Sequence, residues 1–476
     1  MDTPGIPGTP GAPETPEPSP ERGLCLAPFR GLRYVPERVG SLAAVTSPPY
    51  DVVVRPDGQR RLETADPYNV VRLILPDAAT AEEQHRKAAR TLDRWLRDGV
   101  LAPDPRPALY VYEQRDGDHL QRGVIGALRL SPPEDGVVLP HEDVMPGPVA
   151  DRAALMRATG ANLEPLLLAY RGGVATAEVV ERVAAGDAAP GQGTPGDAAP
   201  RDGRSGDAAT GPAPHGRRAP ARADATRPVA PLLTTTTDDG VRHRLWALTD
   251  PADLAAVTAD LATRQALIAD GHHRWATYRR LQAAHPPGTP WDFGLVLLVD
   301  TARYPLRVRA IHRVLPRLRA ADALAAAAEV FRVRRLDGGL DRALAALADS
   351  AADGNAFVLA GDGFHLLDRP DPARLDARVP HDRPETWRRL DATVLHSLLL
   401  DHVWRVPDTP DHIRYIHDTR EAVALAERLG GTAVLLHPVR ERVVLDLARQ
   451  GVMMPRKSTS FGPKAGGLVM RRVDLA

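Results

Sequence analysis

The sequence predicts an α+β fold in which mixed sheets are flanked by helices and followed by a C-terminal α/β region. Three observations support this class. Residues 108–114 and 122–130 are two strand-like runs around a polar turn, which is typical of an antiparallel hairpin. Residues 291–300 form a near-continuous apolar run, as expected for a strand at the centre of a sheet. Residues 319–450 then alternate helical and strand patterns.

The bulk composition bounds the class of protein. A chain of 476 residues is too long for one ordinary core, so about two or three domains are expected. Basic and acidic residues both number 61, which leaves no overall field to attract nucleic acid or an anionic membrane. The single cysteine, Cys25, excludes an internal disulfide and a cysteine metal cluster. Because no signal peptide or membrane span is recognisable, a cytoplasmic protein is expected.

Composition shifts divide the chain into five regions. Segments rich in Pro, Gly and Ala cannot bury enough apolar surface to offset their ordering entropy, so two such segments are predicted to be disordered. The predicted regions are a disordered tail (1–22), an N-terminal α+β region (23–170), a disordered insertion (171–229), a core region (230–318) and a C-terminal α/β region (319–476).

In the N-terminal region the patterns predict strands, one long helix and a hairpin. Residues 27–34 favour a strand, and 66–75 begin with turn residues and continue as a buried strand. An amphipathic stripe over 81–97 predicts a helix that ends near Gly99. The hairpin turn is expected at 115–118, and a further helix is expected from Asp151 to Ala158.

After the insertion the patterns continue to alternate. Residues 241–248 alternate like a half-buried strand, and Asp250-Pro251 starts a helix over 252–263. The remaining expected elements are a strand (309–315), a helix (320–330), a hairpin (356–359 with 363–367), two helices (391–402 and 419–429) and a buried strand (432–439).

The segment from Ala266 to Thr277 predicts a short buried strand, a glycine turn and the start of a helix that runs to about Ala284. Its turn carries Asp270, Gly271, His272, His273 and Arg274. A helix N-terminus presents unpaired backbone N–H groups and a positive dipole end, and arginine adds a planar donor. We therefore expect an anion site here, with a nucleotide phosphate as the ligand. The alternative is a purely structural turn in which Asp270 caps the helix and the histidines pack.

Two proline-rich loops carry further candidates. Residues 140–148 hold His141 and Glu142, which can act as acid, base or metal ligand, in a loop restrained by three prolines. A surface loop of this composition is also commonly only solvated. Pro48 and Pro49 restrict the backbone before Tyr50 and Asp51, although this segment can also be a simple connection.

A basic, hydroxyl-rich loop lies near the C-terminus. Between Met454 and Lys464 it presents Arg456, Lys457, Ser458, Thr459 and Ser460, whose donors suit a phosphate or carboxylate. The loop lacks the glycine and lysine spacing of a Walker A motif. A basic turn without a ligand is the alternative.

Together these motifs resemble those of the uncharacterised domain-of-unknown-function family 1015. The resemblance rests on six motifs in order, at 28–31, 48–51, 69–73, 140–142, 269–274 and 454–464. It runs from about Leu24 to Met470, interrupted by the insertion. The family is uncharacterised, so the resemblance by itself implies no particular activity.

The strand followed by Asp-Gly-His-His-Arg is also similar to the phosphate-binding motif of the ParB-like superfamily, which includes free-serine kinases. This second resemblance covers about a dozen residues. It implies a ParB/serine-kinase-like core, phosphate binding by Gly271 to Arg274, and ATP or ADP as cofactor. It also implies an acidic base elsewhere in the chain, for which Glu142 or Asp51 is the candidate, with His141 beside it.

The leading hypothesis is a phosphotransferase acting on a small hydroxylated metabolite such as serine or phosphoserine. Arg274, Arg456 and Lys457 would neutralise phosphoryl charge, and Asp270 would hold Mg²⁺. One alternative is a nucleotide-responsive regulatory protein without catalysis, and another is metal-assisted hydrolysis by His141, Glu142 and the paired histidines. A small-molecule substrate is expected, nucleic acid and membrane partners are not, and the sequence is compatible with an oligomer. The leading hypothesis requires the separate polar segments to meet around one pocket.

Overall fold

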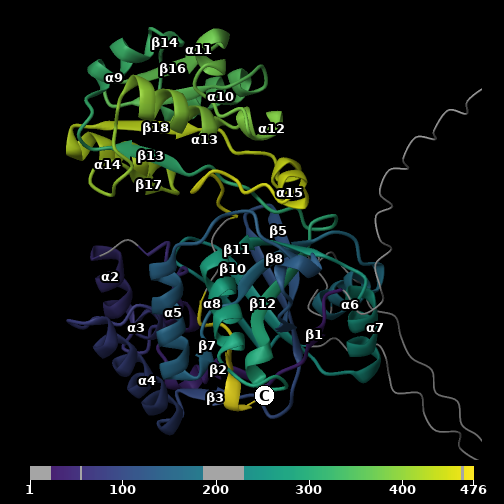
Figure 1. Ribbon diagram of the computed structural model, residues 1–476. Helices are drawn as coiled ribbons and strands as arrows, with labels where there is room; N and C mark the ends of the chain where they lie inside the picture. The colour runs from purple at the N-terminus through teal and green to yellow at the C-terminus, as the bar shows by residue number, and fades with distance from the viewer. Residues whose placement is uncertain (1–22, 54–55, 186–229, 462–465, 476) are drawn as a thin grey trace, which may run out of the picture.

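The computed structural model describes residues 23–53, 56–185, 230–461 and 466–475. Figure 1 shows a larger lobe below and a smaller lobe above, with the yellow C-terminal segment passing from the smaller lobe back to the larger one. The predicted tail (1–22) and residues 186–229 of the predicted insertion lie outside the described residues.

A nine-stranded mixed sheet forms the centre of the larger lobe, in the order β6-β11-β8-β12-β5-β4-β10-β9, with β1 paired to β5. β12 pairs parallel with β8 and antiparallel with β5, so its predicted central place is confirmed. The predicted hairpin is also confirmed as β4 and β5. The bounds are β1 Leu26–Ala27, β4 Leu109–Asp116, β5 His119–Arg129, β6 Val138–Leu139, β8 Leu166–Tyr170, β9 Leu233–Thr236, β10 Arg242–Leu248, β11 Ala266–Asp270 and β12 Phe293–Asp300.

Successive residues of each strand point to opposite faces of this sheet, so each face has its own core. In β12, Val296 and Leu298 contribute to one core, whereas Leu295 and Leu297 contribute to the other. This double burial explains why the strand is apolar along its length. Four helices cover the first face: α5 Pro146–Thr159, α6 Val174–Ala185, α7 Pro251–Leu261 and α8 His272–Ala283.

The second face is covered by the C-terminal part of the chain. Helix α15 (Glu441–Arg449) places Val444 and Leu447, both fully buried, in the second core. Met454 and Phe461, which follow α15, join the same core. The basic loop between Met454 and Phe461 is therefore anchored to this face of the large sheet by a buried apolar residue at each end.

A third layer lies beside α5, with its helices at the left of the larger lobe and its strands near the bottom of that lobe in Figure 1. Its four-stranded sheet has the order β3-β2-β19-β7, so a strand from the end of the chain lies between two N-terminal strands. The bounds are β2 Gly31–Tyr34, β3 Leu101–Pro103, β7 Ala161–Asn162, β19 Met470–Arg472, α1 Leu42–Val45, α2 Asp57–Ala65, α3 Val71–Ile74 and α4 Ala81–Arg97.

The smaller lobe is built on a six-stranded sheet with the order β14-β16-β15-β18-β13-β17, in which every pair is antiparallel. The predicted hairpin is present as β15 and β16. The bounds are β13 His312–Leu315, β14 Arg332–Leu336, β15 Phe357–Ala360, β16 Phe364–Asp368, β17 Arg414–Ile416, β18 Thr432–Leu436, α9 Ala320–Ala327, α10 Leu340–Ala351, α11 Pro372–Asp376, α12 Glu385–Arg388, α13 Asp391–Val394, the π-helix η4 Leu395–Val403 and α14 Thr419–Leu429.

The mixed α+β class is confirmed, but three local predictions are wrong. The strand predicted within 66–75 is instead the short helix α3, because the Asn69 side chain accepts from the Val71 N–H and donates to two carbonyls of the α1 region. Helix α6 lies within the predicted insertion and buries Val179 and Val180, so that prediction is wrong for Val174–Ala185. Helix α5 begins at Pro146, not at Asp151, since proline suits the first helical turn.

Among the described residues, no helix is both long enough and apolar enough to cross a bilayer.

The docking of α15 on the sheet yields a stability prediction. Leu447→Ala should lower the free energy of unfolding by about 2 to 5 kcal/mol, because the lost side chain leaves a cavity in a closed core. Leu429→Ala is the matched control, since this leucine also lies on a helix but is 40% exposed. The Leu429→Ala change should alter the free energy of unfolding by no more than about 0.5 kcal/mol. Urea unfolding of both variants makes the comparison, and equal effects would contradict the described packing.

Candidate functional site

The turn between β11 and α8 is shaped by Gly271. Its φ of +98° lies in the left-handed region that favours glycine. A Cβ atom at this position would lie 2.5 Å from Leu166 Cδ2 and 3.1 Å from Arg274 Nε. The glycine thus allows the chain to reverse sharply, so that the N-terminus of α8 lies directly beside the end of β11.

Arg274, in the first turn of α8, is 2% exposed. Its Nη2 donates to Asp270 Oδ2 at 2.7 Å, and its Nη1 donates to the Pro165 carbonyl at 2.9 Å. Burial favours a lower pKa for this guanidinium, but the nearby carboxyls of Glu164, Asp270 and Asp51 outweigh burial and raise the pKa. Arg274 is therefore a buried, permanently charged group that attracts carboxylates around the turn.

Glu164 is the buried acid behind this turn. It is 6% exposed, and its Oε1 accepts a hydrogen bond from the Tyr50 N–H at 3.2 Å. Burial raises the pKa of the Glu164 carboxyl, with Asp51 adding to the effect and Arg274 opposing it. The Tyr50 ring lies 4.5 Å beneath the Arg152 guanidinium of α5. These contacts hold the Pro49–Asp51 segment against the Asp270–Arg274 turn.

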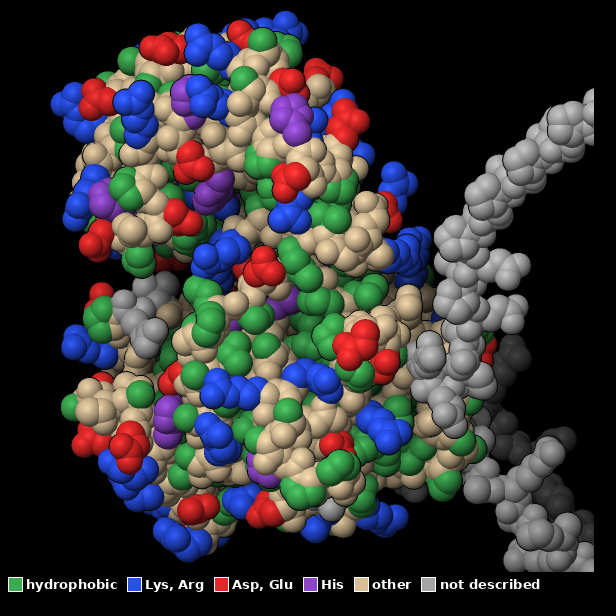
Figure 2. Space-filling model, viewed as in Figure 1, with side chains coloured by type: hydrophobic (Ala, Val, Ile, Leu, Met, Phe, Trp, Pro, Cys, Tyr) green, Lys and Arg blue, Asp and Glu red, His purple; other side chains and the backbone are tan. Residues whose placement is uncertain are grey.

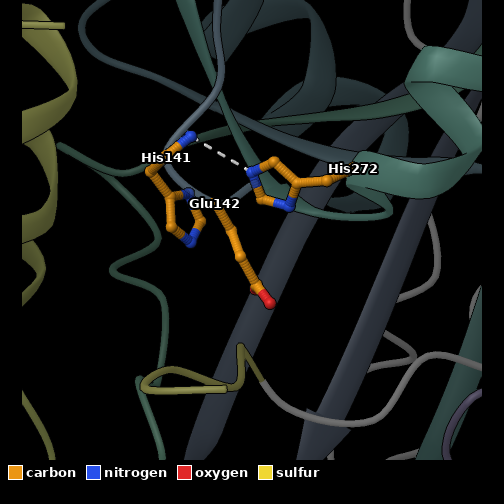
Figure 3. A group of neighbouring side chains, drawn as sticks. All are labelled: His141, Glu142 and His272. Carbon is orange, nitrogen blue, oxygen red and sulfur yellow. Dashed lines mark hydrogen bonds between the residues drawn. The ribbon is translucent and has the colours of Figure 1, made fainter. Parts of the chain in front are cut away.

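The predicted loop around His141 and Glu142 is bonded directly to both histidines of the turn. The His141 N–H donates to His272 Nε2 at 3.2 Å, and the Met145 N–H donates to His273 Nε2 at 3.1 Å. Figure 3 shows the His141 and His272 rings close together, with the Glu142 side chain extending past them. The ring centroids are 4.4 Å apart and the planes are nearly perpendicular. Burial lowers the pKa of His141 to about 4, so this imidazole is neutral near neutral pH.

The C-terminal loop forms the next wall of the site. Its Met454 N–H donates to the His141 carbonyl at 2.7 Å, and its Lys457 N–H donates to Glu142 Oε1 at 3.3 Å. Thr459 Oγ1 lies 3.2 Å from His141 Nε2. Lys457 has a φ of +54°, which costs a residue other than glycine about 1 to 2 kcal/mol. Strain of this kind persists at sites where the surroundings dictate the backbone.

The smaller lobe adds two residues, Ile311 and His417, which were not predicted. Ser460 and Arg309 form an isolated antiparallel bridge, so the C-terminal loop is joined to the segment that leads into the smaller lobe. Burial lowers the pKa of His417, and Lys457 adds to this effect, while Asp51 and Asp270 oppose it. Figure 2 shows basic, acidic and histidine side chains together at the waist between the lobes.

These segments enclose one narrow cavity of about 50 Å³. This volume holds on the order of four water molecules, which is comparable to a phosphate group. Of the predicted site residues, Arg456 and Ser458 do not line it, and Arg456 Nη2 instead lies 3.0 Å from Met145 Sδ. The predicted residues that do line it are Asp51, His141, Glu142, Asp270, Gly271, His272, His273, Arg274, Lys457, Thr459 and Ser460.

The carboxyl groups that line this cavity make acid and base chemistry possible there. Burial raises the pKa of Glu142, with Asp270 and Asp51 adding to the effect and Lys457 opposing it. A carboxyl whose pKa is moved toward neutrality is suited to general acid and base chemistry. The cavity thus combines an acid or base, fixed cations and the N-terminus of α8.

A family model described as "Protein of unknown function (DUF1015)" matches residues 26–195 and 218–393. The chain belongs to the DUF1015 family. The match includes the Asp51, His141 and Asp270 segments of this DUF1015 chain, whereas the loop at 454–461 lies beyond the matched residues. Among curated proteins, none matches the sequence.

The comparison with solved structures matches a free serine kinase in complex with AMP, which is 13% identical to this DUF1015 chain. The match covers 74% of this chain and 93% of that chain, with a TM-score of 0.33. A conserved hypothetical protein from Pyrococcus furiosus is 15% identical. The match covers 74% of this chain and 97% of that protein, with a TM-score of 0.32. C-terminally truncated SbnI from Staphylococcus aureus is 9% identical. The match covers 70% of this chain and 82% of that protein, with a TM-score of 0.31.

Three side chains of the DUF1015 site have the spacing of metal ligands. One ligand atom each from His141, Glu142 and His272 lies within 4.8 Å of the other two. Two imidazole nitrogens and one carboxylate suit Zn²⁺ or another transition metal better than Mg²⁺, which prefers oxygen ligands. His272 Nε2 already accepts from the His141 backbone, so a metal bound through that nitrogen would replace the hydrogen bond. Asp270, the predicted metal ligand, is not part of this group.

Sequence patterns missed Glu164 and His417 for different reasons. Glu164 is an acid between Leu163 and Pro165 in an otherwise apolar stretch, and this context is a usable signal of a buried charge. His417 lies in a short polar connection between β17 and α14 that resembles many surface turns. Nothing local distinguishes it, because its place in the site depends on how the two lobes meet.

The sharp turn yields a second stability prediction. Gly271→Ala should destabilise the protein by about 1 to 3 kcal/mol more than Gly99→Ala, because the new methyl group would overlap Leu166. Gly99 is a fair control, since its φ is also positive at +67° but no atom lies within 4 Å of an added Cβ. Chemical denaturation would measure both variants. Equal losses would contradict the close approach of Leu166 to the turn.

Proposed function

We propose that this protein is a nucleotide-dependent phosphotransferase that moves a phosphoryl group to or from a small hydroxylated metabolite, with serine and phosphoserine as the first candidates. The observation that supports the proposal is the convergence of four polar segments, each distant in sequence, on one cavity of phosphate size. The segments contribute Asp51, the His141–Glu142 pair, the Asp270–Arg274 turn and the Lys457–Ser460 loop.

Phosphate binding is assigned to the turn and the basic loop. The backbone N–H groups and the positive dipole end at the start of α8 favour an anion. Lys457 supplies a cation, and the hydroxyls of Thr459 and Ser460 supply further donors. Arg274 has a different task from the one expected from sequence, since its two Nη atoms already bond protein groups. It holds the turn and Asp270 in place and contributes positive charge from behind.

Glu142 is assigned the role of general base, in preference to Asp51. Burial raises the pKa of its carboxyl, and its Oε1 is positioned by the Lys457 N–H. In the forward direction the metabolite hydroxyl oxygen attacks the terminal phosphorus of the nucleotide. The new P–O bond forms as the bond to the leaving nucleotide breaks, and the hydroxyl proton passes to Glu142. The shortened nucleotide leaves with the bridging oxygen.

Mg²⁺ fits the oxygen donors at the cavity. Asp51 and Asp270 both line it and both raise the pKa of Arg274, so they lie near the same charge. Mg²⁺ in phosphotransferases is commonly held by one or two carboxylates together with substrate phosphates. Bound there, it would neutralise the charge that develops on the transferring phosphoryl group.

The size of the cavity implies that the substrates extend beyond it. At about 50 Å³ it holds the phosphoryl group but not a nucleoside. His417 and Ile311 close one side from the smaller lobe, so separation of the lobes gives access, and their approach excludes water from the reacting group.

A direct assay tests the proposal. The full-length chain incubated with ATP or ADP, Mg²⁺ and serine should form phosphoserine together with the shortened nucleotide, measured by mass spectrometry. Nucleotide should also raise the melting temperature, because it binds the folded state. Nucleotide binding with a change of oligomeric state but no product would overturn catalysis in favour of a nucleotide-responsive regulatory protein. If the assay showed no turnover and nucleotide caused no thermal shift, both functions would be overturned.

Substitution of the assigned base gives a sharper prediction. Glu142→Gln should lower kcat by about 10² to 10⁴, since the variant cannot accept the proton. In the native protein the rate should rise as pH increases through the Glu142 pKa, which lies above the usual carboxyl value, and this rise should be absent from the variant.

The matched control for that experiment is Glu134→Gln, because Glu134 is exposed in the short helix at Pro133–Asp135 and does not line the cavity. Its activity and pH profile should equal those of the native protein. An unchanged kcat in Glu142→Gln would assign the base elsewhere.

A further inference from the structure

A second, larger cavity lies in the N-terminal layer, between α4 and the segment formed by α2 and α3. Its volume is about 300 Å³, at the lower end of the range for small-molecule sites. None of its lining residues lines the candidate site. Cations dominate the lining, with Arg72, Lys87, Arg90 and Arg94 against the two carboxyls of Glu63 and Asp77.

Helix α4 presents three of these cations on one face. Lys87, Arg90 and Arg94 are spaced three and four residues apart, so they are neighbours along the helix surface. Like charges at this spacing repel and destabilise a helix. Within the described part of the chain, none of the three forms an ion pair with a carboxylate. By contrast Arg86, which does not line the cavity, pairs with Glu82 at 2.5 Å.

The opposite wall places a fourth cation toward the same space. Arg72 of α3 donates from Nη2 to the Glu63 carbonyl at 2.6 Å, and its buried Nε has no hydrogen-bond partner among the described residues. Lys87 Nζ donates to the Asp77 carbonyl at 2.6 Å. Backbone carbonyls thus position two cations without neutralising them. Thr91, a residue with a hydroxyl group, also lines the cavity.

We propose that this cavity binds a small phosphorylated ligand that carries at least two negative charges, at a site separate from the proposed catalytic one. Four cations that have no carboxylate partner among the described residues repel one another, and a multivalent anion would relieve this repulsion through charge-assisted hydrogen bonds. The planar guanidinium groups of Arg90 and Arg94 can each bind phosphate oxygens in pairs.

A compact anion fits better than a nucleic acid backbone. Nucleic acid binding relies on many phosphate contacts along an extended basic surface. Here the cations surround one concavity, and the chain as a whole has no net charge. The carboxyls of Glu63 and Asp77 in the lining would repel a continuous phosphate backbone, whereas they can accept hydrogen bonds from the hydroxyls of a small metabolite.

Calorimetry with inorganic pyrophosphate on the full-length chain tests the proposal. The double variant R90Q/R94Q should weaken binding at this site at least about tenfold, because each change removes a charge-assisted contact. The control R86Q/R97Q removes two exposed cations from the same helix that do not line the cavity, and its isotherm should match that of the native protein. Lys87→Gln, a single change of an exposed side chain, gives a second measurement with little risk to folding.

A Lys457→Gln background separates this site from the proposed catalytic one. That change weakens phosphate binding at the candidate site only, so binding that is sensitive to R90Q/R94Q should persist. An isotherm unaffected by R90Q/R94Q and Lys87→Gln would overturn the proposal. It would also be overturned if a duplex oligonucleotide bound more tightly than pyrophosphate and lost that binding in R90Q/R94Q.

Discussion

The buried charge of Arg274 is the constraint on which the rest of the site depends. A guanidinium removed from water is stable only when nearby groups compensate its lost hydration. Asp270 and the Pro165 carbonyl bond it directly, and Glu164 and Asp51 add negative charge. Because these partners come from separate segments, satisfying one cation brings the end of β11, the start of β8 and the N-terminal loop together.

Further walls are attached to this centre by hydrogen bonds to backbone atoms. The His141 and Met145 N–H groups donate to the paired histidines, and the Met454 and Lys457 N–H groups bind the His141–Glu142 segment. The C-terminal loop that carries Met454 and Lys457 is held against the sheet by the apolar residues of α15. A site made in this way uses the stability of the large core to hold polar side chains close together, at the cost of local strain at Lys457.

Elements with strong periodicity could be predicted from sequence, and those governed by a single polar side chain could not. Helix α4, the β4–β5 hairpin and the central strand β12 were predicted because their apolar spacing reflects burial. Val71, Leu73 and Ile74 suit burial in either a strand or a short helix, and the hydrogen bonds of Asn69 decide for the helix. The Asp270–Arg274 turn was recognisable because its glycine and polar residues are contiguous.

The sequence by itself determined the chemistry of each segment: a glycine turn with imidazoles and a guanidinium, a His–Glu loop between prolines, and a basic hydroxyl-rich loop. Only the tertiary structure decided which of these groups share a cavity. It added His417 to the lining, placed Glu164 behind the turn, left Arg456 and Ser458 outside the lining, and made Arg274 a buried anchor. The physical reason is that local sequence patterns report burial and turns, whereas hydration of a buried charge is replaced by partners that lie far away along the chain.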